Sequence, residues 1–249
     1  MKTTDLIQYL DNYLNIQAIS DYGPQGLQVE ADNDNIERIA LAVDVAPPII
    51  QAAAQWQADM LLVHHGIFWR TVERIAGPLG ARVRLLLQNN MHLYAAHLAL
   101  DAHPEVGNNA QLAHMLGLKD VSWWCQINGV DIGVIGTLDM PLTQLTEEVE
   151  TRLNTQARVL AHGPAHVQRL AIVSGFGADQ VLEAKKMGAD TLLTGEMSHA
   201  HYWAASDYGV NVLFGGHYAT ETVGVRALGQ HLTEKFGVSV RFFDFPTAM

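Results

Sequence analysis

Cysteine is almost absent from this sequence, because Cys125 is the only one among 249 residues. An intramolecular disulfide is therefore impossible, and a zinc site built from several cysteines is excluded. Long apolar runs are missing as well, since no stretch approaches the roughly 18 apolar residues of a membrane span. The N-terminus has no continuous apolar run either. We therefore expect a soluble, cytoplasmic protein that does not enter a membrane.

Positive charge is also scarce. The net charge is −11, and no cluster of lysine and arginine stands out. A protein that binds duplex DNA through its phosphates needs a basic face, so DNA binding is disfavoured. Small anionic substrates stay compatible with the sequence, because bound metal ions would supply positive charge locally. With 49% hydrophobic residues, the chain can form one large α/β domain or two smaller ones.

The sequence contains an ordered series of three internal matches. The matched segments are residues 38–41 with 169–172, residues 58–62 with 189–193, and residues 97–101 with 217–221. The first two pairs share an offset of 131 (169 − 38), and the third has an offset of 120 (217 − 97), as a loop of different length would produce. Because any two βαβ units look alike locally, the order of the matches carries the inference of an internal duplication.

Both copies show strands alternating with helices. The expected strands are residues 39–43, 60–63, 92–96, 170–173, 191–194 and 210–214, and the expected helices are residues 47–56, 82–88 and 181–187. This order favours parallel sheets. At the N-terminus, Leu6, Leu10 and Leu14 recur every four residues and predict an amphipathic helix with Thr4 as its N-cap.

We therefore predict an α/β protein of two similar α/β domains related by internal duplication. The first repeat, with the N-terminal helix, covers residues 1–120. The second covers residues 121–249 and includes a small α/β insertion at about 121–164, with a strand at 130–138 followed by a helix.

Residues with metal-binding side chains follow directly on the expected strands. His64 and His65 follow one strand, His97 another, and His217 a third after two glycines. In open parallel sheets, ligands bind outside the carboxyl ends of the strands. His97 with Asp101, and His217 with Glu221, are four residues apart, so on a helix each pair lies on one face. A carboxylate can bridge two cations, which makes Glu221 or Asp101 the natural centre of a two-metal cluster.

Each of these features also has a simpler interpretation. A His-His pair after a strand can be a structural pair, and histidine four residues before a carboxylate is common on surface helices. The combination of six such side chains at strand ends, two of the motifs being related by the repeat, favours the metal site. Glu196 is a candidate general base or a supporting carboxylate. The segment 174–177 resembles a phosphate-binding loop or a tight turn. Because Gln180 replaces the third glycine of a dinucleotide motif, a metal-free nucleotide-binding domain is disfavoured.

Across essentially its whole length the sequence resembles the family of GTP cyclohydrolase I type 2 homologues, also called Nif-three-like proteins, in its short bacterial form. The segments that carry the resemblance are 21–29 (DYGPQGLQV), 63–66 (VHHG), 94–101 (YAAHLALD), 107–109 (GNN), 194–199 (TGEMSH) and 216–221 (GHYATE). The resemblance implies two similar α/β domains that face each other across a dinuclear metal cleft holding two divalent ions. It also implies a toroidal homohexamer. By position, it implies the ligands His64, His65, Asp101, His217 and Glu221, with Glu221 bridging. His97 matches a residue near the ions that either binds them or supports one that does.

We therefore expect a divalent-metal-dependent hydrolase with a dinuclear site, acting on a nucleotide-like or other small polar substrate. Such a site activates water and polarises a phosphoryl or carbonyl oxygen. The alternative is a metal-binding oligomeric scaffold or regulatory protein without chemistry. Imidazole and carboxylate ligands without thiolate suit two ions of zinc, iron, manganese, nickel or cobalt.

Overall fold

The computed structural model describes residues 1–69 and 74–247, and the chain divides into two compact units. Unit 1 comprises residues 1–106 and 224–245, and unit 2 comprises residues 107–223 and the C-terminal residues from 246. Helix α9 (His217–Phe236) begins in unit 2 and ends in unit 1. The boundary of the two proposed repeats near residue 120 stays a prediction.

Unit 1 is built around a five-stranded sheet with the strand order β1-β4-β3-β2-β11. Its elements are α1 (Thr3–Tyr13), the 3-10 helix η1 (Ile16–Ala18), β1 (Gly26–Val29), β2 (Arg38–Ala42), α2 (Pro47–Gln55), β3 (Met60–Val63), α3 (Gly77–Gln88), β4 (His92–Ala95), α4 (Leu98–Asp101), the later part of α9, and β11 (Ser239–Phe242). Strands β4, β3, β2 and β11 are parallel, and β1 pairs antiparallel with β4 at one edge.

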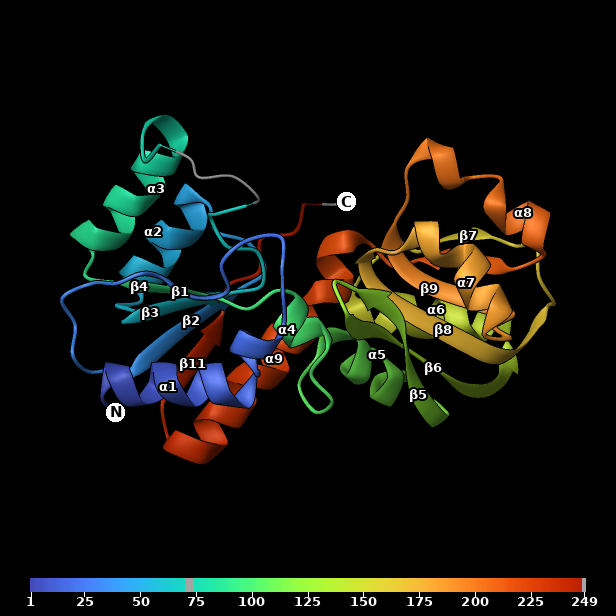
Figure 1. The fold of residues 1–249 in the computed structure, drawn as a ribbon, viewed down its shortest axis with the longest axis horizontal. Coiled ribbons are helices and arrows are strands. Elements are labelled where there is room, and N and C mark those ends of the chain that lie inside the picture. Colours follow the sequence, from blue (N-terminus) through green and yellow to red (C-terminus); the bar gives the residue numbers. More distant parts are fainter. Residues whose placement is uncertain (70–73, 248–249) are drawn as a thin grey trace. The chain divides into compact units, whose positions relative to one another are not determined.

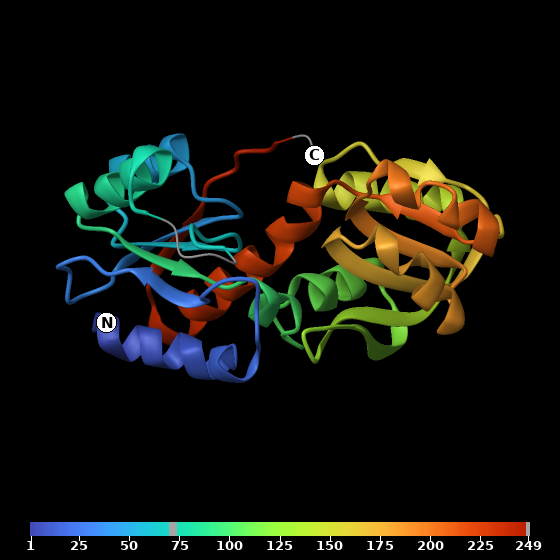
Figure 2. The same ribbon diagram turned by 45° about the horizontal axis from the view of Figure 1, so that its top comes forward.

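Helices cover both faces of this sheet, so its strands are apolar on both sides (Figure 1). Successive residues of a strand point to opposite faces. Ile39 and Leu41 pack with α1 and the later part of α9, whereas Ala40 packs with α2 and α3. Figure 2 shows α1 beneath the sheet of unit 1, and helices α2 and α3 above it. This arrangement buries the strands and leaves their carboxyl ends available for a site.

Unit 2 is built around a six-stranded sheet with the strand order β5-β6-β8-β9-β10-β7. Its elements are α5 (Asn108–Leu116), β5 (Lys119–Ile127), β6 (Val130–Pro141), α6 (Leu142–Leu153), β7 (Arg158–Leu160), β8 (His166–Phe176), the 3-10 helix η2 (Ala178–Gln180), α7 (Val181–Lys186), β9 (Thr191–Glu196), the 3-10 helix η3 (His199–His201), α8 (Ala204–Tyr208), β10 (Asn211–Phe214) and the start of α9. Strands β8, β9 and β10 are parallel, and the other pairings are antiparallel.

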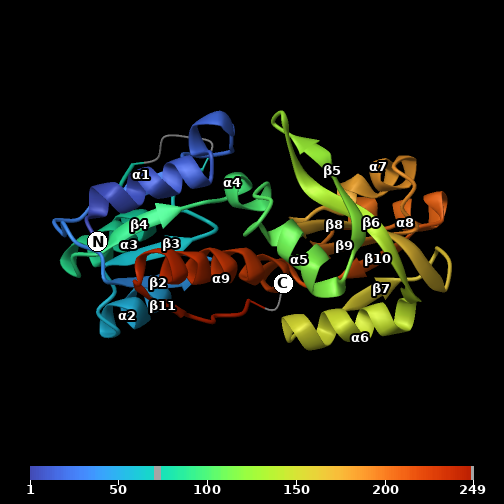
Figure 3. The same cartoon turned by 90° about the horizontal axis from the view of Figure 1, so that it is seen from below.

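The main core of unit 2 lies between its sheet and helices α5 and α6. Leu145 and Val149 of α6 pack with Leu170 and Ile172 of β8. Helices α7 and α8 lie on the opposite face (Figure 3). Each unit therefore contains a trio of parallel strands, β2-β3-β4 or β8-β9-β10, with helices on both faces.

Most of the expected elements are present, with ends displaced by a few residues, and two expectations need correction. Thr4 is not the N-cap of α1, because the helix begins at Thr3 and Lys2 occupies the capping position without a side-chain cap. The sheets are mixed rather than purely parallel, since the edge strands β1, β5 and β7 and the inner strand β6 pair antiparallel. Among residues 1–69 and 74–247, none of the helices has the length and apolar character needed to cross a bilayer.

Candidate metal centre

Three histidines of unit 1 stand at the carboxyl ends of two adjacent parallel strands. His64 and His65 follow β3, and both of their backbone N–H groups donate to the carbonyl oxygen of Val43, at 3.1 and 2.8 Å. The chain thus leaves the sheet at this point, which brings both rings to the same end of it. His97 follows β4, the neighbour of β3. The expectation that these residues lie at strand ends is confirmed.

The three rings form a compact cluster. Ligand atoms of His64, His65 and His97 all lie within 4.8 Å of one another, a spacing that can hold a metal ion. The buried side chain of Asp101 joins them, with Oδ1 3.1 Å from Nε2 of His64. Asp101 is placed by α4, whose turn begins at His97 and closes with the Asp101 N–H donating to the His97 carbonyl at 3.0 Å. Unit 1 therefore unites four of the six predicted ligands.

Unit 2 holds the other two. His217 opens α9 just after β10, and Glu221 lies one turn further along, where it is 4% exposed. Their side chains meet, with Nε2 of His217 3.1 Å from Oε1 of Glu221. The predicted pairing on one helix face is therefore present.

A carboxylate contacts Nδ1 of three of these histidines. The distances to the nearest carboxylate oxygen are 2.8 Å for His65 with Asp44, 2.9 Å for His97 with Asp21, and 2.8 Å for His217 with Glu196. A carboxylate only accepts hydrogen bonds, so each Nδ1 carries a hydrogen, and in the neutral ring Nε2 then keeps its lone pair. Metal-binding histidines typically donate such a hydrogen bond from the ring nitrogen that does not bind the metal. This bond fixes the ring and makes the other nitrogen a more basic ligand.

Sequence reasoning missed two of these three carboxylates. Asp44 lies just beyond the end of β2, so the rule that identified the histidines could also have found it. Asp21 lies in the irregular segment before β1, where no periodicity marks it. Glu196, which we expected to act as a base or a support, contacts His217 and therefore has the geometry of a support.

His217 lies in a strongly acidic environment. Burial lowers the pKa of its imidazole, but the hydrogen bonds and negative charges of Glu221 and Glu196 outweigh burial and raise the pKa to about 9. Two carboxylates that face one imidazole form a site that attracts positive charge, whether a proton or a metal ion.

The residues present fit divalent metal ions. All donors are imidazole nitrogens or carboxylate oxygens, a set that suits first-row transition metals. If two donor atoms each lie about 2.1 Å from one ion, and the angle between the two metal–donor bonds is roughly 90°, the donor atoms lie about 3.0 Å apart. The pairs His64–Asp101 and His217–Glu221 each have 3.1 Å between donor atoms.

Glycine keeps the space beside Glu221 open. A Cβ atom at Gly175 would collide with Oε1 of Glu221 and lie 3.2 Å from Nε2 of His217. Gly175 also has a φ of +62°, in the left-handed region that favours glycine. A Cβ at Gly195 would lie 2.6 Å from the Cα of His217. Small residues thus let two strand ends approach this pair closely.

The segment 174–177 is neither a tight turn nor a phosphate-binding loop, because residues 174–176 form the end of β8, where the pairing with β9 shifts register between Val173 and Phe176. Its N–H groups donate within unit 2: Ser174 to Asn109 at 2.7 Å, Gly175 to Thr220 at 3.0 Å, and Gly177 to Thr194 at 2.9 Å. These three N–H groups therefore already have partners within the protein, and this end of β8 lies close to the side chain of Glu221.

Comparison with known proteins identifies the family of this chain. The family model Duf34/NIF3 (NGG1p interacting factor 3) matches residues 1–248. A Deinococcus radiodurans protein named GTP cyclohydrolase 1 type 2 homolog is 43% identical over 247 residues, which cover 98% of this chain and 94% of that protein. A Pyrococcus abyssi protein of the same name is 42% identical, with 100% of both chains covered. A crystal structure from Thermus thermophilus is 39% identical, covers 100% of both chains and has a TM-score of 0.92. The chain belongs to the Duf34/NIF3 family, whose relatives bear the name GTP cyclohydrolase 1 type 2 homolog.

Proposed function

We propose that this protein is a divalent-metal-dependent hydrolase with a dinuclear site, acting on a nucleotide-like or other small polar substrate. The observation that carries the proposal is the presence in each unit of a histidine–carboxylate pair at the end of a parallel trio, with donor atoms 3.1 Å apart. In this proposal the two pairs, with His65 and His97, bind two ions across a cleft between two duplicated α/β repeats.

The protein side chains hold and orient the centre. His64, His65, His97 and Asp101 would bind from the first repeat, and His217 and Glu221 from the second. Divalent ions supply Lewis-acid activation of water and of a phosphoryl or carbonyl oxygen. Asp44 and Glu196 keep Nε2 of their histidines directed away from the supporting carboxylate. A nucleotide substrate agrees with the name of the relatives, GTP cyclohydrolase 1 type 2 homolog.

The test combines metal analysis with turnover. Protein purified without chelators should contain two divalent ions per chain, and it should hydrolyse at least one member of a panel of nucleotides and phosphoesters. Glu221→Gln removes the charge at nearly constant size and should abolish that activity. An unchanged rate in this variant would show that the activity comes from elsewhere.

A second candidate is a metal-binding scaffold or regulatory protein without chemistry, as the family name of an interacting factor suggests. It predicts metal binding, partner binding that survives Glu221→Gln, and no turnover of any substrate. Both candidates are compatible with the proposed cytoplasmic location and with the proposed toroidal homohexamer. Light scattering on the purified protein would test whether it forms a hexamer. If the protein were a monomer in solution, neither candidate function could involve a toroidal hexamer.

A further inference from the structure

We propose that Asp21 is a positioning residue of the candidate metal centre, which fixes His97 with Nε2 as its ligand atom. This inference rests on the proposed metal site and deepens it, because it makes His97 a ligand rather than a neighbour of the ligands. Asp21 lies 76 residues before His97 in the chain, in the loop that precedes β1.

Asp21 holds both the ring and the backbone of the His97 turn. Its carboxylate oxygens accept from Nδ1 of His97 at 2.9 and 3.1 Å, and Oδ2 also accepts from the backbone N–H of Leu98 at 2.8 Å. Oδ1 accepts in addition from the N–H of Tyr22 at 2.6 Å. Three donors thus converge on one carboxylate, and hydrogen bonds to a charged acceptor are about twice as strong as neutral ones.

Burial distinguishes Asp21 from the other two carboxylates that contact a histidine Nδ1. The side chain of Asp21 is 2% exposed, whereas those of Asp44 and Glu196 are 36% and 33% exposed. Water can replace a hydrogen bond to a partly exposed carboxylate but not one to a buried carboxylate. Rotation of the His97 ring therefore loses a hydrogen bond that solvent cannot restore.

The rest of the same loop supports this geometry. Oε1 of Gln25 accepts from the backbone N–H groups of His97 and Ala99, at 3.2 and 2.9 Å. Oε1 of Gln28 accepts from the N–H of Ile67 at 2.8 Å, in the turn that follows His65. The segment 21–28 therefore holds the backbone after both strand ends, and Asp21 is the member that also fixes a ring.

The decisive variant is Asp21→Asn. Asparagine offers one acceptor oxygen where three donors converge, and its amide group would turn N–H bonds toward some of those donors. Nitrogen NMR of histidine-labelled, metal-free protein should show the Nδ1–H tautomer of His97 in the wild type. The variant should show a mixture of the Nδ1–H and Nε2–H tautomers. Cobalt titration should show an affinity loss of about 10- to 100-fold in the variant, with an altered visible spectrum.

Asp59→Asn is the matched control. Asp59 is a partly buried carboxylate of unit 1 that accepts two backbone N–H groups, but it lies at the opposite end of β3 from His64. Its substitution should leave the His97 ring form and the cobalt affinity unchanged. Asp21→Glu keeps the charge and should recover part of the affinity lost in Asp21→Asn.

Two results would overturn the inference. The Asp21→Asn protein could fold and keep both the wild-type cobalt affinity and the wild-type His97 tautomer. That result would show that Asp21 does not position His97. A wild-type protein with the His97 hydrogen on Nε2 would do the same without any variant, even if Asp21→Asn fails to fold. If the wild type binds no divalent ion, the proposed function fails, while the ring measurement still decides the role of Asp21.

Discussion

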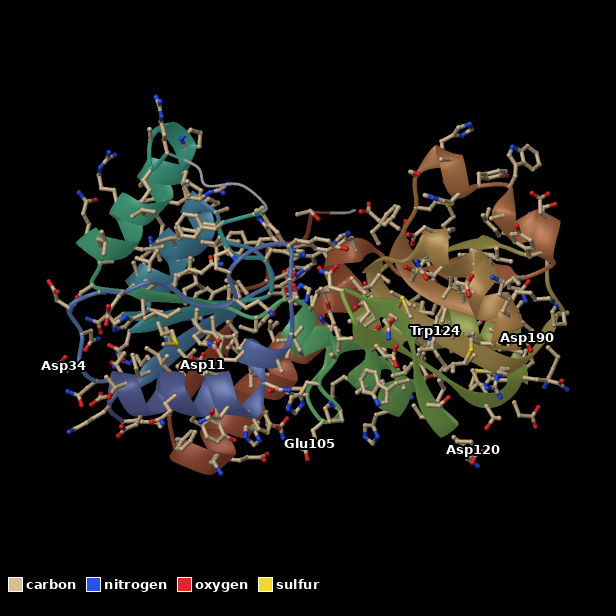
Figure 4. All side chains as sticks on the ribbon, in the orientation of Figure 1. Asp11, Asp34, Glu105, Asp120, Trp124 and Asp190 are labelled. Carbon is tan, nitrogen blue, oxygen red and sulfur yellow. The ribbon has the colours of Figure 1, made fainter. Side chains whose placement is uncertain are left out.

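The Oδ2 atoms of Asp59 and Asp190 make matching backbone contacts in the sheets of the two units. The Oδ2 atom of Asp59 accepts two successive backbone N–H groups at the start of β2, at 2.8 Å each. The Oδ2 atom of Asp190, labelled in Figure 4, accepts two successive N–H groups in β8, at 2.8 and 3.0 Å. The two residues are 131 positions apart (190 − 59), which is the offset of two of the internal matches. This equivalence supports the proposed duplication.

The matching backbone contacts of the two carboxylates predict similar losses of stability when either is replaced. Asp59→Asn and Asp190→Asn should each lower the free energy of unfolding by about 1–3 kcal/mol, because a charged acceptor of two backbone donors is lost in each case. Chemical denaturation of the purified variants measures this. Asp34→Asn, at an exposed position in unit 1, is the control and should change stability by no more than about 0.5 kcal/mol. Clearly unequal effects of the first two variants would argue against equivalent roles.

Gly175→Ala should damage both stability and metal binding. Its Cβ would collide with Glu221 Oε1, and the backbone has a positive φ that alanine adopts at a cost of about 1–2 kcal/mol. Gly129 has a φ of +88°, and a Cβ atom there would have nothing within 4 Å, so Gly129→Ala is a control for backbone strain alone. Thermal unfolding and metal content together separate the two effects. Equal behaviour of both variants would contradict the collision.

Divalent ions should stabilise the folded protein. A ligand that binds the native but not the unfolded chain adds about 2.7 kcal/mol at a concentration 100 times its Kd. Removing metal with a chelator should therefore lower the Tm, and adding zinc or manganese should restore it. Glu221→Gln should weaken this response. Glu234→Gln, at an exposed carboxylate of the same helix, should respond as the wild type does. If the Tm changes neither on treatment with chelator nor on addition of metal, that result would argue against a metal centre.

The stability of unit 1 should fall on acidification through His103. Nδ1 of His103 accepts from the N–H groups of Glu105 and Val106, and Nε2 donates to the carbonyl of Tyr13, so the neutral ring is the form that fits. Burial lowers the pKa of this imidazole, outweighing the carbonyl of Tyr13 and the charge of Glu105, which raise it. The unfolded chain therefore binds more protons around the folded pKa, and stability rises with pH in that range.

The measurement compares unfolding at about pH 7.5 and about pH 5.5, on either side of the ordinary histidine pKa of about 6.5. The stability contributed by neutral His103 is present above that value and is lost as the pH falls through the lower folded pKa. His103→Gln should be less stable than the wild type at the higher pH but should lose less on acidification. His114→Gln, at an exposed histidine, should keep the wild-type slope. An unchanged slope in His103→Gln would refute the assignment.

Local sequence patterns were sufficient for most of the secondary structure. The apolar run 60–63 is β3 as expected, and the helix predicted from Pro47 is α2. Both depend on side-chain periodicity and proline geometry, which act over a few residues. The N-cap of α1 was predicted wrongly, because a capping side chain is favourable but not required for a helix to begin. The antiparallel edge strands had no local mark, since pairing direction depends on which strands meet.

The sequence by itself determined the ligand-type residues and their places at strand ends, because a strand, its end and an i to i+4 helix pair are short-range features. It also determined membership of the family, through motifs spread along the whole chain. Only the tertiary structure decided which carboxylate supports which histidine, as Asp21 with His97 shows. It likewise decided why residue 175 is glycine, because the atoms that a Cβ would meet there belong to residues more than forty positions away in the chain.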